Sequence, residues 1–242
     1  MNNINVQADA NVLTGRIDLI PFTESTLQDS EIAISRHRSR SLYQEKPVYE
    51  MVKRTFDVVC SLLAIAALSP LMLVVAVLIV LDDFGSPIYM QERVGRNGKT
   101  FKIYKFRSMY KKADKIRDQL ASLDESNGAT FKMKNDPRIT RIGHIIRKTS
   151  IDELPQLFNI LKGEMSIIGP RPFIAKEQAL LPNDRLLVNP GLSCYWQVGG
   201  KNSLTTEEQI ALDRKYIRER SIAVDIKIII KTILFVFKSG NS

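Results

Sequence analysis

The chain has 242 residues and a formal net charge of +9, from 35 lysines and arginines against 26 acidic residues. This length allows one sizeable core or one domain with an appendage, and the basic excess favours anionic partners such as phosphates, nucleotides or an anionic membrane face. Cys60 and Cys194 are too few for a disulfide framework, which fits a reducing cytoplasm, and no secretory signal is visible after Met1.

Residues 1–47 are polar and weakly periodic, which predicts a mobile N-terminal extension. They contain a basic cluster at Arg36–Arg40. This cluster is either a solvated tail or a segment attracted to anionic lipid, and the sequence leaves both readings open.

Residues 58–81 form an uncharged apolar block. As a helix it would be about 36 Å long, enough to cross a hydrocarbon core of about 30 Å. The central pair Ser69-Pro70 argues against a simple span, because proline removes a backbone hydrogen bond and the serine hydroxyl can satisfy the freed carbonyl. Basic residues flank both ends, so both ends are expected on the cytoplasmic side. The sequence therefore favours a re-entrant helix-break-helix hairpin over residues 48–84, with a spanning helix and a buried core helix as alternatives.

A short strand or hairpin is predicted next, with Asn97-Gly98 as its turn. The signal is an alternation of apolar Phe101, Ile103, Tyr104 and Phe106 with basic Lys102, Lys105 and Arg107. Lys105 and Arg107 form either a solvated strand face or part of a path for an anionic ligand.

Residues 110–121 predict a charged helix, and residues 122–137 a polar loop. Isoleucines then recur at helical spacing between Ile139 and Ile146.

The most informative stretch is residues 147–172, where Asp152 and Glu153 stand at a predicted helix start. With Asp152 as the N-cap, Pro155 falls at the third helical position, where its missing N–H costs nothing. A capping box between Ser150 and Glu153 competes, but it moves Pro155 to a position whose N–H is normally bonded. The favoured register predicts a helix that ends at Gly163 and buries the apolar stripe Leu154, Leu157, Phe158 and Leu161.

The adjacent acids Asp152 and Glu153 are ordinary at a helix N-terminus, where they complement the macrodipole. Their surroundings suggest more, because Arg147 lies just upstream and Arg171 lies downstream in the rigid turn Gly169–Pro172. One carboxylate can attack phosphorus while its neighbour holds Mg²⁺, a cation that pairs one or two carboxylates with substrate phosphates. The pattern favours phosphoryl-transfer chemistry.

The rest of the chain predicts a turn at Asn189–Gly191, a strand over residues 193–198 and a polar helix over residues 206–220. Residues 222–237 are strongly apolar but interrupted by charges, which is typical of an interfacial or docking helix. Asp225 within it needs a partner, either a nearby lysine or a metal.

These motifs together resemble the bacterial sugar transferase family, the small monotopic phosphoglycosyl transferases, over about residues 48–238. The resemblance rests on KRTFD, the central Ser69-Pro70, QERVGRNGKTFKIYKFRSM, DPRITRIGHIIRKTSIDELPQLFNILKGEMSIIGPRP and SIAVDIKIIIKT. It implies transfer of a sugar-1-phosphate from a UDP-sugar to undecaprenyl phosphate, with release of UMP and a covalent phosphosugar-aspartyl intermediate. This is the initiating step of exopolysaccharide, capsule or other glycoconjugate synthesis.

The resemblance also assigns roles to residues. Asp152 is the expected nucleophile, Glu153 is expected to support Mg²⁺ together with Asp152, and Ser69-Pro70 is the expected membrane break. Four further residues match family active-site positions and are expected to contact substrate or to act as a structural acid: Lys105, Arg147, Arg171 and Asp225. The chain departs from the family pattern at Ser193–Gln197 and at Lys201, which leaves the sugar open.

The expected fold class is mixed α/β and mostly helical, with the re-entrant hairpin followed by a small cytosolic catalytic domain, residues 85–242, that carries interfacial helices. The expected location is the bacterial inner membrane, with the catalytic domain on the cytoplasmic face. Expected partners are the UDP-sugar, undecaprenyl phosphate and anionic membrane lipids. A homo-oligomer and association with other glycan-assembly enzymes stay open. A catalytically silent membrane adaptor is the alternative, and nucleic-acid binding is disfavoured because no reader motif is present.

Overall fold

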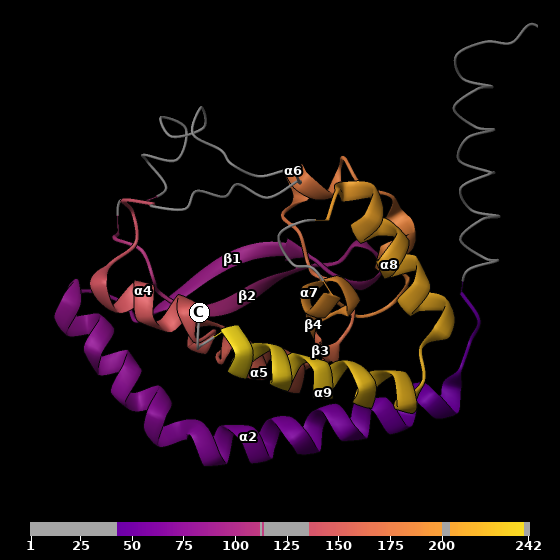
Figure 1. Ribbon diagram of the computed structural model, residues 1–242, viewed down its shortest axis with the longest axis horizontal. Helices are drawn as coiled ribbons and strands as arrows, with labels where there is room; N and C mark the ends of the chain where they lie inside the picture. Colours follow the sequence, from indigo (N-terminus) through magenta and orange to yellow (C-terminus); the bar gives the residue numbers. More distant parts are fainter. Residues whose placement is uncertain (1–42, 112, 114–135, 200–203, 240–242) are drawn as a thin grey trace, which may run out of the picture. The chain divides into compact units, whose positions relative to one another are not determined.

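The apolar segment forms a single helix, α2 (Pro47–Asp82), of 36 residues (Figure 1). The computed structural model describes residues 43–111, 113, 136–199 and 204–239. The chain divides into two units, Met1–Ser41 and Leu42–Ser242, and all that follows belongs to the second. Nearly all of the predicted extension, most of the predicted charged helix and most of the predicted polar loop lie outside the described residues.

Helix α2 runs through Pro70 without interruption, but it bends (Figure 1). Pro70 has no N–H to donate to the carbonyl of Ala66, four residues earlier. The hydroxyl of Ser69 donates to that carbonyl instead, at 3.0 Å, as the sequence led us to expect. The predicted break is therefore a bend within one helix, with about 34 Å of helix before Pro70 and about 20 Å from Pro70 onward.

The surface of α2 is apolar and largely uncovered. Only 11% of its most apolar window is buried, whereas the core helix of a soluble protein would be mostly buried. Large side chains such as Leu63, Leu73 and Leu81 are exposed. Among the described residues it is the one helix long and apolar enough to cross a membrane, and these features together indicate a membrane-bound protein.

The predicted hairpin is confirmed. Strands β1 (Ile88–Val94) and β2 (Thr100–Phe106) pair antiparallel, with Ile88 opposite Phe106. The short 3-10 turn η1 (Arg96–Gly98) joins them. Asn97 adopts the left-handed conformation with φ 57°, which asparagine tolerates better than most residues.

Three helical pieces follow the hairpin in sequence: α4 (Arg141–Lys148), the 3-10 turn η3 (Ile151–Glu153) and α5 (Gln156–Lys162). The hydroxyl of Thr140 caps α4 by accepting a hydrogen bond from the amide of Gly143 at 2.9 Å. Gly163 ends α5 with φ 81°, as predicted.

The side chain of Asn159 joins α5 to the edge of β2. Its Oδ1 accepts from the amide of Tyr104 at 2.9 Å, and its Nδ2 donates to the carbonyl of Lys102 at 2.8 Å. Asn159 is fully buried, and it completes backbone hydrogen bonds that an unpaired strand edge would leave open. Next to these hydrogen bonds, which form the seam between α5 and β2, Phe101 and Ile103 share a core cluster with Leu157.

Two predictions around α5 are wrong. Asp152 is not the N-cap, because Pro155 occupies that position. Asp152 and Glu153, called the dyad below, lie one turn earlier in η3. The cause is a run of 3-10 hydrogen bonds, such as Glu153 N–H to Ser150 O at 3.2 Å, that winds the chain tighter before α5. The buried stripe is also rotated, since Gln156, Leu157, Asn159 and Ile160 are the buried members of the helix, whereas Phe158 is exposed.

A second, parallel pair joins β3 (Ser166–Ile168) to β4 (Gly191–Ser193). Gly169 and Gly191 touch closely enough that a Cβ on Gly191 would lie 2.1 Å from the Gly169 nitrogen. The predicted strand over residues 193–198 is wrong, because β3 offers only three residues to pair with and the chain turns into helix after Ser193.

The remaining described elements are helical: α6 (Ala175–Gln178), η4 (Asn183–Leu187), α7 (Tyr195–Gly199), α8 (Thr206–Glu219) and α9 (Ile222–Ser239). Of these, α9 contacts both strands of the parallel pair, whereas α6 contacts β1. The predicted polar helix corresponds to α8 and the apolar helix to α9. Arg54 of α2 donates to the carbonyls of Ile160 and Leu161 at 2.5 and 2.7 Å, so the long helix caps the C-terminus of α5.

Candidate active site

Asp152 and Glu153 lie in η3, where the chain reverses between α4 and α5. The reversal depends on Ser150, whose backbone is left-handed with φ 57°. Both acids are half-buried, and the Glu153 carboxylate accepts a hydrogen bond from the Lys105 ammonium at 2.9 Å. Since the side chain of Glu153 is 23% exposed and that of Lys105 is 20% exposed, this ion pair remains open to a ligand from solution.

Arg147 is exposed in the last turn of α4, just before the reversal. It acts electrostatically on Asp136, whose pKa is lowered mainly by a hydrogen bond from the buried Arg138 guanidinium at 2.6 Å and to a smaller extent by Arg147. The structure thus places Lys105 and Arg147 in or next to the segments that carry the dyad.

Arg171 lies in the segment that follows β3. Its carbonyl accepts from the Arg185 guanidinium at 2.9 Å, and its positive charge acts on Cys194, whose pKa is nevertheless raised by burial. Arg107, which the alternation placed on the basic face of the strand, is instead buried and pairs with Asp83 at 3.8 Å.

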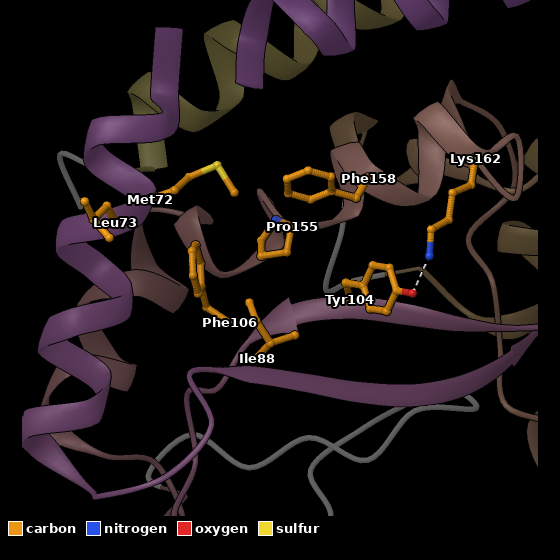
Figure 2. Close-up of a pocket in the computed structure, with 8 residues that line it drawn as sticks. All are labelled: Met72, Leu73, Ile88, Tyr104, Phe106, Pro155, Phe158 and Lys162. Carbon is orange, nitrogen blue, oxygen red and sulfur yellow. Dashed lines mark hydrogen bonds between the residues drawn. The ribbon is translucent and has the colours of Figure 1, made fainter. Parts of the chain in front are cut away.

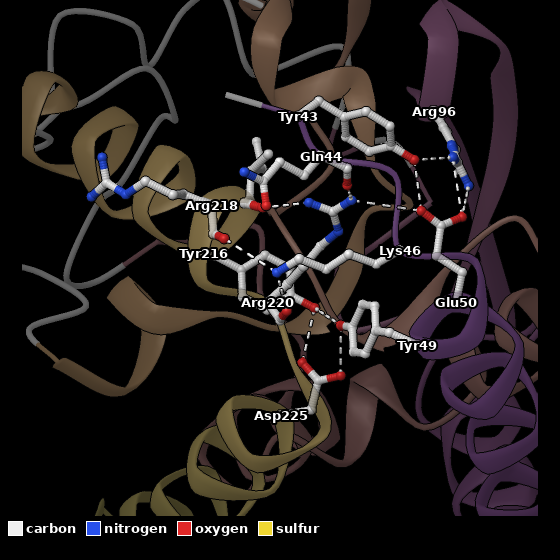
Figure 3. Close-up of polar contacts among 11 residues, drawn as sticks. Tyr43, Gln44, Lys46, Tyr49, Glu50, Arg96, Tyr216, Arg218, Arg220 and Asp225 are labelled. Carbon is white, nitrogen blue, oxygen red and sulfur yellow. Dashed lines mark hydrogen bonds and ion pairs between the residues drawn. The ribbon is translucent and has the colours of Figure 1, made fainter. Parts of the chain in front are cut away.

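Asp225 belongs to a different cluster, near the start of α2 (Figure 3). It is buried, and it accepts from Lys53 at 2.8 Å and from the hydroxyls of Tyr49 and Tyr216, each at 2.9 Å. Burial beside this carboxylate raises the pKa of Tyr216 well above its ordinary value. The sequence correctly suggested a lysine partner, but it gave no sign of the two tyrosines.

The Asp225 cluster and the dyad lie next to different parts of α2. Lys53 marks the Asp225 end of α2, whereas Leu154, directly after the dyad, packs against a core cluster that includes Val75 and Ile79 from the part of α2 beyond the bend. From Lys53 to Pro70 alone, α2 extends about 25 Å. The structure therefore brings Lys105 and Glu153 together but does not bring Asp225 to them.

Charged contacts around Glu50 extend the same cluster and hold the start of α2 (Figure 3). Glu50 accepts from the hydroxyl of Tyr43 at 2.6 Å and pairs with Arg96 at 3.3 Å and with Arg220 at 3.7 Å. Lys46 donates to the carbonyl of Arg220 at 2.9 Å. These contacts fasten α2 to η1 and to the end of α8.

Within the described part of the chain, no group of three or more histidine, cysteine or acidic side chains could hold a metal ion. Asp152 and Glu153 offer two carboxylates, which fits Mg²⁺, because this ion completes its shell with water and substrate phosphates. Glu153 is engaged by Lys105, so a cation would compete with that ammonium.

An apolar pocket of about 470 Å³ lies beside the dyad segment (Figure 2). Its walls come from the part of α2 after the bend, from the hairpin, and from α5 with its N-cap: Met72, Leu73, Ile88, Tyr104, Phe106, Pro155, Phe158 and Lys162. The sequence reading missed it, because it placed Phe158 in the core.

Comparison with known proteins decides the family. The model of the bacterial sugar transferase family matches residues 48–239, which include all of α2 but its first residue, the dyad and α9. The chain belongs to the bacterial sugar transferase family. The resemblance drawn from the motifs is thereby confirmed.

Individual relatives agree. The chain is 43% identical to the UDP-galactose-lipid carrier transferase of Erwinia amylovora over 216 residues, covering 86% of this chain and 43% of that protein. It is 39% identical to the exopolysaccharide production protein ExoY of Rhizobium meliloti over 204 residues, covering 81% of this chain and 90% of ExoY. It is 42% identical to the undecaprenyl-phosphate galactose phosphotransferase of Salmonella typhimurium over 198 residues, covering 79% and 41%. The chain therefore spans less than half of the two named transferases and most of ExoY.

Proposed function

We propose that the chain transfers a sugar-1-phosphate from a UDP-sugar to undecaprenyl phosphate, releases UMP, and so initiates synthesis of an exopolysaccharide, capsule or other glycoconjugate. The observation that carries the proposal is the Asp152-Glu153 dyad, paired to Lys105 within the family-matched region that includes an uncovered apolar helix. The names of the Erwinia and Salmonella relatives suggest the donor and acceptor classes.

In the proposed reaction an oxygen of the Asp152 carboxylate attacks the β-phosphorus of the UDP-sugar. The bond from that phosphorus to the bridging oxygen breaks, and UMP leaves with the electron pair. A phosphate oxygen of the lipid then attacks the same phosphorus, and the Asp152 carboxylate leaves. Two successive displacements mean that the soluble donor and the apolar acceptor need not be bound together.

The surrounding groups would offset phosphate charge. Lys105 pairs with Glu153, and Arg147 lies at the end of α4, five residues before Asp152. Both are proposed as phosphate contacts, together with Arg171. Mg²⁺, held by Glu153 and Asp152, would supply additional positive charge to the phosphates when bound. Asp225 is proposed as a structural acid rather than a substrate contact, because three donors already hold it.

We place the chain at the cytoplasmic face of the bacterial inner membrane, with α2 entering and leaving by the same face at its bend. The Ser69 hydrogen bond supports this arrangement, because it lets the helix bend without leaving the Ala66 carbonyl unsatisfied in hydrocarbon. Helix α9 would lie in the interface through its exposed apolar face, which comprises Ile226, Ile230, Ile233 and Leu234.

The test replaces the proposed nucleophile. In membranes supplied with radiolabelled UDP-sugar and undecaprenyl phosphate, wild type should release UMP and trap a phosphosugar adduct after rapid quench. Asp152→Asn should lose at least about 10³-fold in turnover and form no adduct while remaining folded and membrane-bound. The exposed Glu207→Gln change in α8 is the control and should retain turnover.

Two outcomes would contradict the proposal. An adduct or substantial turnover in Asp152→Asn would remove Asp152 as the nucleophile. A wild-type protein that makes neither UMP nor lipid-linked sugar with any UDP-hexose would favour the silent membrane adaptor.

A further inference from the structure

The pocket beside α5 has the size and lining of a ligand site. Its volume of about 470 Å³ is within the common range for small-molecule pockets, and its lining is almost entirely carbon. Figure 2 shows Met72, Phe106, Pro155 and Phe158 directed into one shared space. A pocket of this composition suits a hydrocarbon chain, because its polar groups are confined to the Tyr104 hydroxyl and the Lys162 ammonium.

This pocket is continuous with the surface that faces lipid. Leu73 lines it and is 67% exposed, and Leu71 and Val74 on the same part of α2 are also exposed. Phe158, on the opposite wall, is 42% exposed. A chain entering from the hydrocarbon layer along α2 would meet the pocket without crossing water.

A cation stands at one end of the pocket. The exposed Lys162 ammonium donates to the hydroxyl of Tyr104 at 2.5 Å and lies 4.5 Å from the centre of that ring (Figure 2). An apolar lining with an ammonium at its rim complements a lipid that carries an anionic group.

The wall formed by Pro155, Tyr104 and Phe106 lies next to the dyad. Pro155 lines the pocket, and Asp152 is three residues earlier in a 3-10 run, which spans about 6 Å along the axis. Tyr104 and Phe106 of the pocket flank Lys105, whose ammonium holds Glu153. The pocket and the proposed reacting groups are thus built on the same two short segments, residues 152–155 and residues 104–106.

We infer that this pocket binds the first isoprene units of the lipid-phosphate acceptor, so that the acceptor phosphate is delivered to the side of η3. The inference rests on the proposed function for the identity of the acceptor. The apolar lining takes the branched chain, while Lys162 and Lys105 attract its phosphate. A resident phospholipid in the same space would block the acceptor, so the two occupants are mutually exclusive.

The first experiment measures binding without turnover. The full chain is placed in vesicles of phosphatidylethanolamine and phosphatidylglycerol and exposed to a polyprenyl phosphate that carries a diazirine on its first isoprene units. Photolabelling should fall on the peptides that contain Met72, Leu73, Pro155 and Phe158, and undecaprenyl phosphate should suppress it. Labelling elsewhere, or equal suppression by added phosphatidylglycerol, would overturn the inference.

The second experiment places a charge in the pocket. Phe158→Asp should reduce photolabelling and raise the KM for undecaprenyl phosphate by about tenfold or more, because a carboxylate in the apolar lining repels both chain and phosphate. The matched control is Leu180→Asp, at a leucine that is 81% exposed and not among the pocket-lining residues. An unchanged acceptor KM in Phe158→Asp, with labelling equal to the control, would refute the site.

The two proposals fail separately. If wild type shows no transfer but the pocket is labelled and Phe158→Asp abolishes labelling, the reaction is wrong and the lipid site stands. If transfer proceeds and the pocket is not labelled, the reaction stands and the acceptor binds elsewhere.

Discussion

Replacing Asp225 with asparagine separates a structural from a substrate-binding role for this residue. Its carboxylate pairs with Lys53 at 2.8 Å, and the two side chains are only 6% and 15% exposed. Breaking a buried ion pair by removing one charge typically destabilises a protein by about 3–5 kcal/mol, because the other charge is left without compensation. The asparagine oxygen can still accept from Tyr49 or Tyr216, so we expect the lower end, about 3 kcal/mol.

That loss should lower the apparent Tm of the detergent-solubilised protein by about 6–12 °C, since 1 kcal/mol corresponds to about 2–4 °C in a chain of this size. Thermal unfolding followed by circular dichroism measures it. Glu207→Gln, an exposed acid in α8, is the control and should shift Tm by less than about 2 °C. In the double variant Lys53→Met/Asp225→Asn, part of the loss should be recovered, because no unpaired ammonium then remains.

The reasoning would be refuted by a Tm within about 1 °C of wild type together with a large rise in the KM for the UDP-sugar. That result would show that Asp225 contacts the donor and that its three hydrogen bonds contribute little to stability.

Three further predictions concern the bend in α2, the hydrogen bonds of Asn159 between α5 and β2, and the loss of the Asp136–Arg138 ion pair at low pH. Pro70→Ala should straighten α2 toward a spanning helix, and cysteine labelling from both membrane faces measures this change. A labelling pattern identical to that of wild type would contradict the idea that Pro70 causes the bend. Asn159→Leu should destabilise the fold by about 1–3 kcal/mol, because the Tyr104 amide and the Lys102 carbonyl lose their side-chain partner; a urea midpoint close to wild type would contradict this. Because Arg138 lowers the pKa of Asp136, their pair stabilises the fold above the ordinary carboxyl pKa of about 3.9 and loses this effect as pH falls through the lowered pKa. The Tm difference between wild type and Arg138→Met should therefore be largest near neutral pH and shrink below about pH 4, and a constant difference would refute the assignment.

Local rules predicted the parts of the fold that depend on single residues. The hairpin turn at Asn97, the end of α5 at Gly163 and the Ser69 hydrogen bond all follow from the conformational or hydrogen-bonding properties of one side chain. Lys105 also meets the dyad, although the strand pattern alone did not distinguish it from Arg107.

The errors arose where long-range contacts decide the outcome. The register of α5 depends on the fit of Asn159 to the edge of β2, which rotates Phe158 out of the core and into the pocket. The short β4 ends at Ser193 because its partner is short, and no property of residues 193–198 reveals that partner. Likewise, Asp225 can be recognised as an acid that needs a partner, but Tyr49 and Tyr216 are brought to it only by the packing of α2 against α8 and α9.

The two hydrogen bonds from Arg54 have a mechanical consequence. They join α2 directly to the last turn of α5, the helix that follows Asp152 and Glu153. Any change in how deeply α2 sits, whether from bilayer thickness or from lipid composition, would shift α5 and the dyad with it. If the dyad reacts as proposed, the depth of α2 in the bilayer sets the height of the reaction above the hydrocarbon, and a fragment cut after α2 would lose this control.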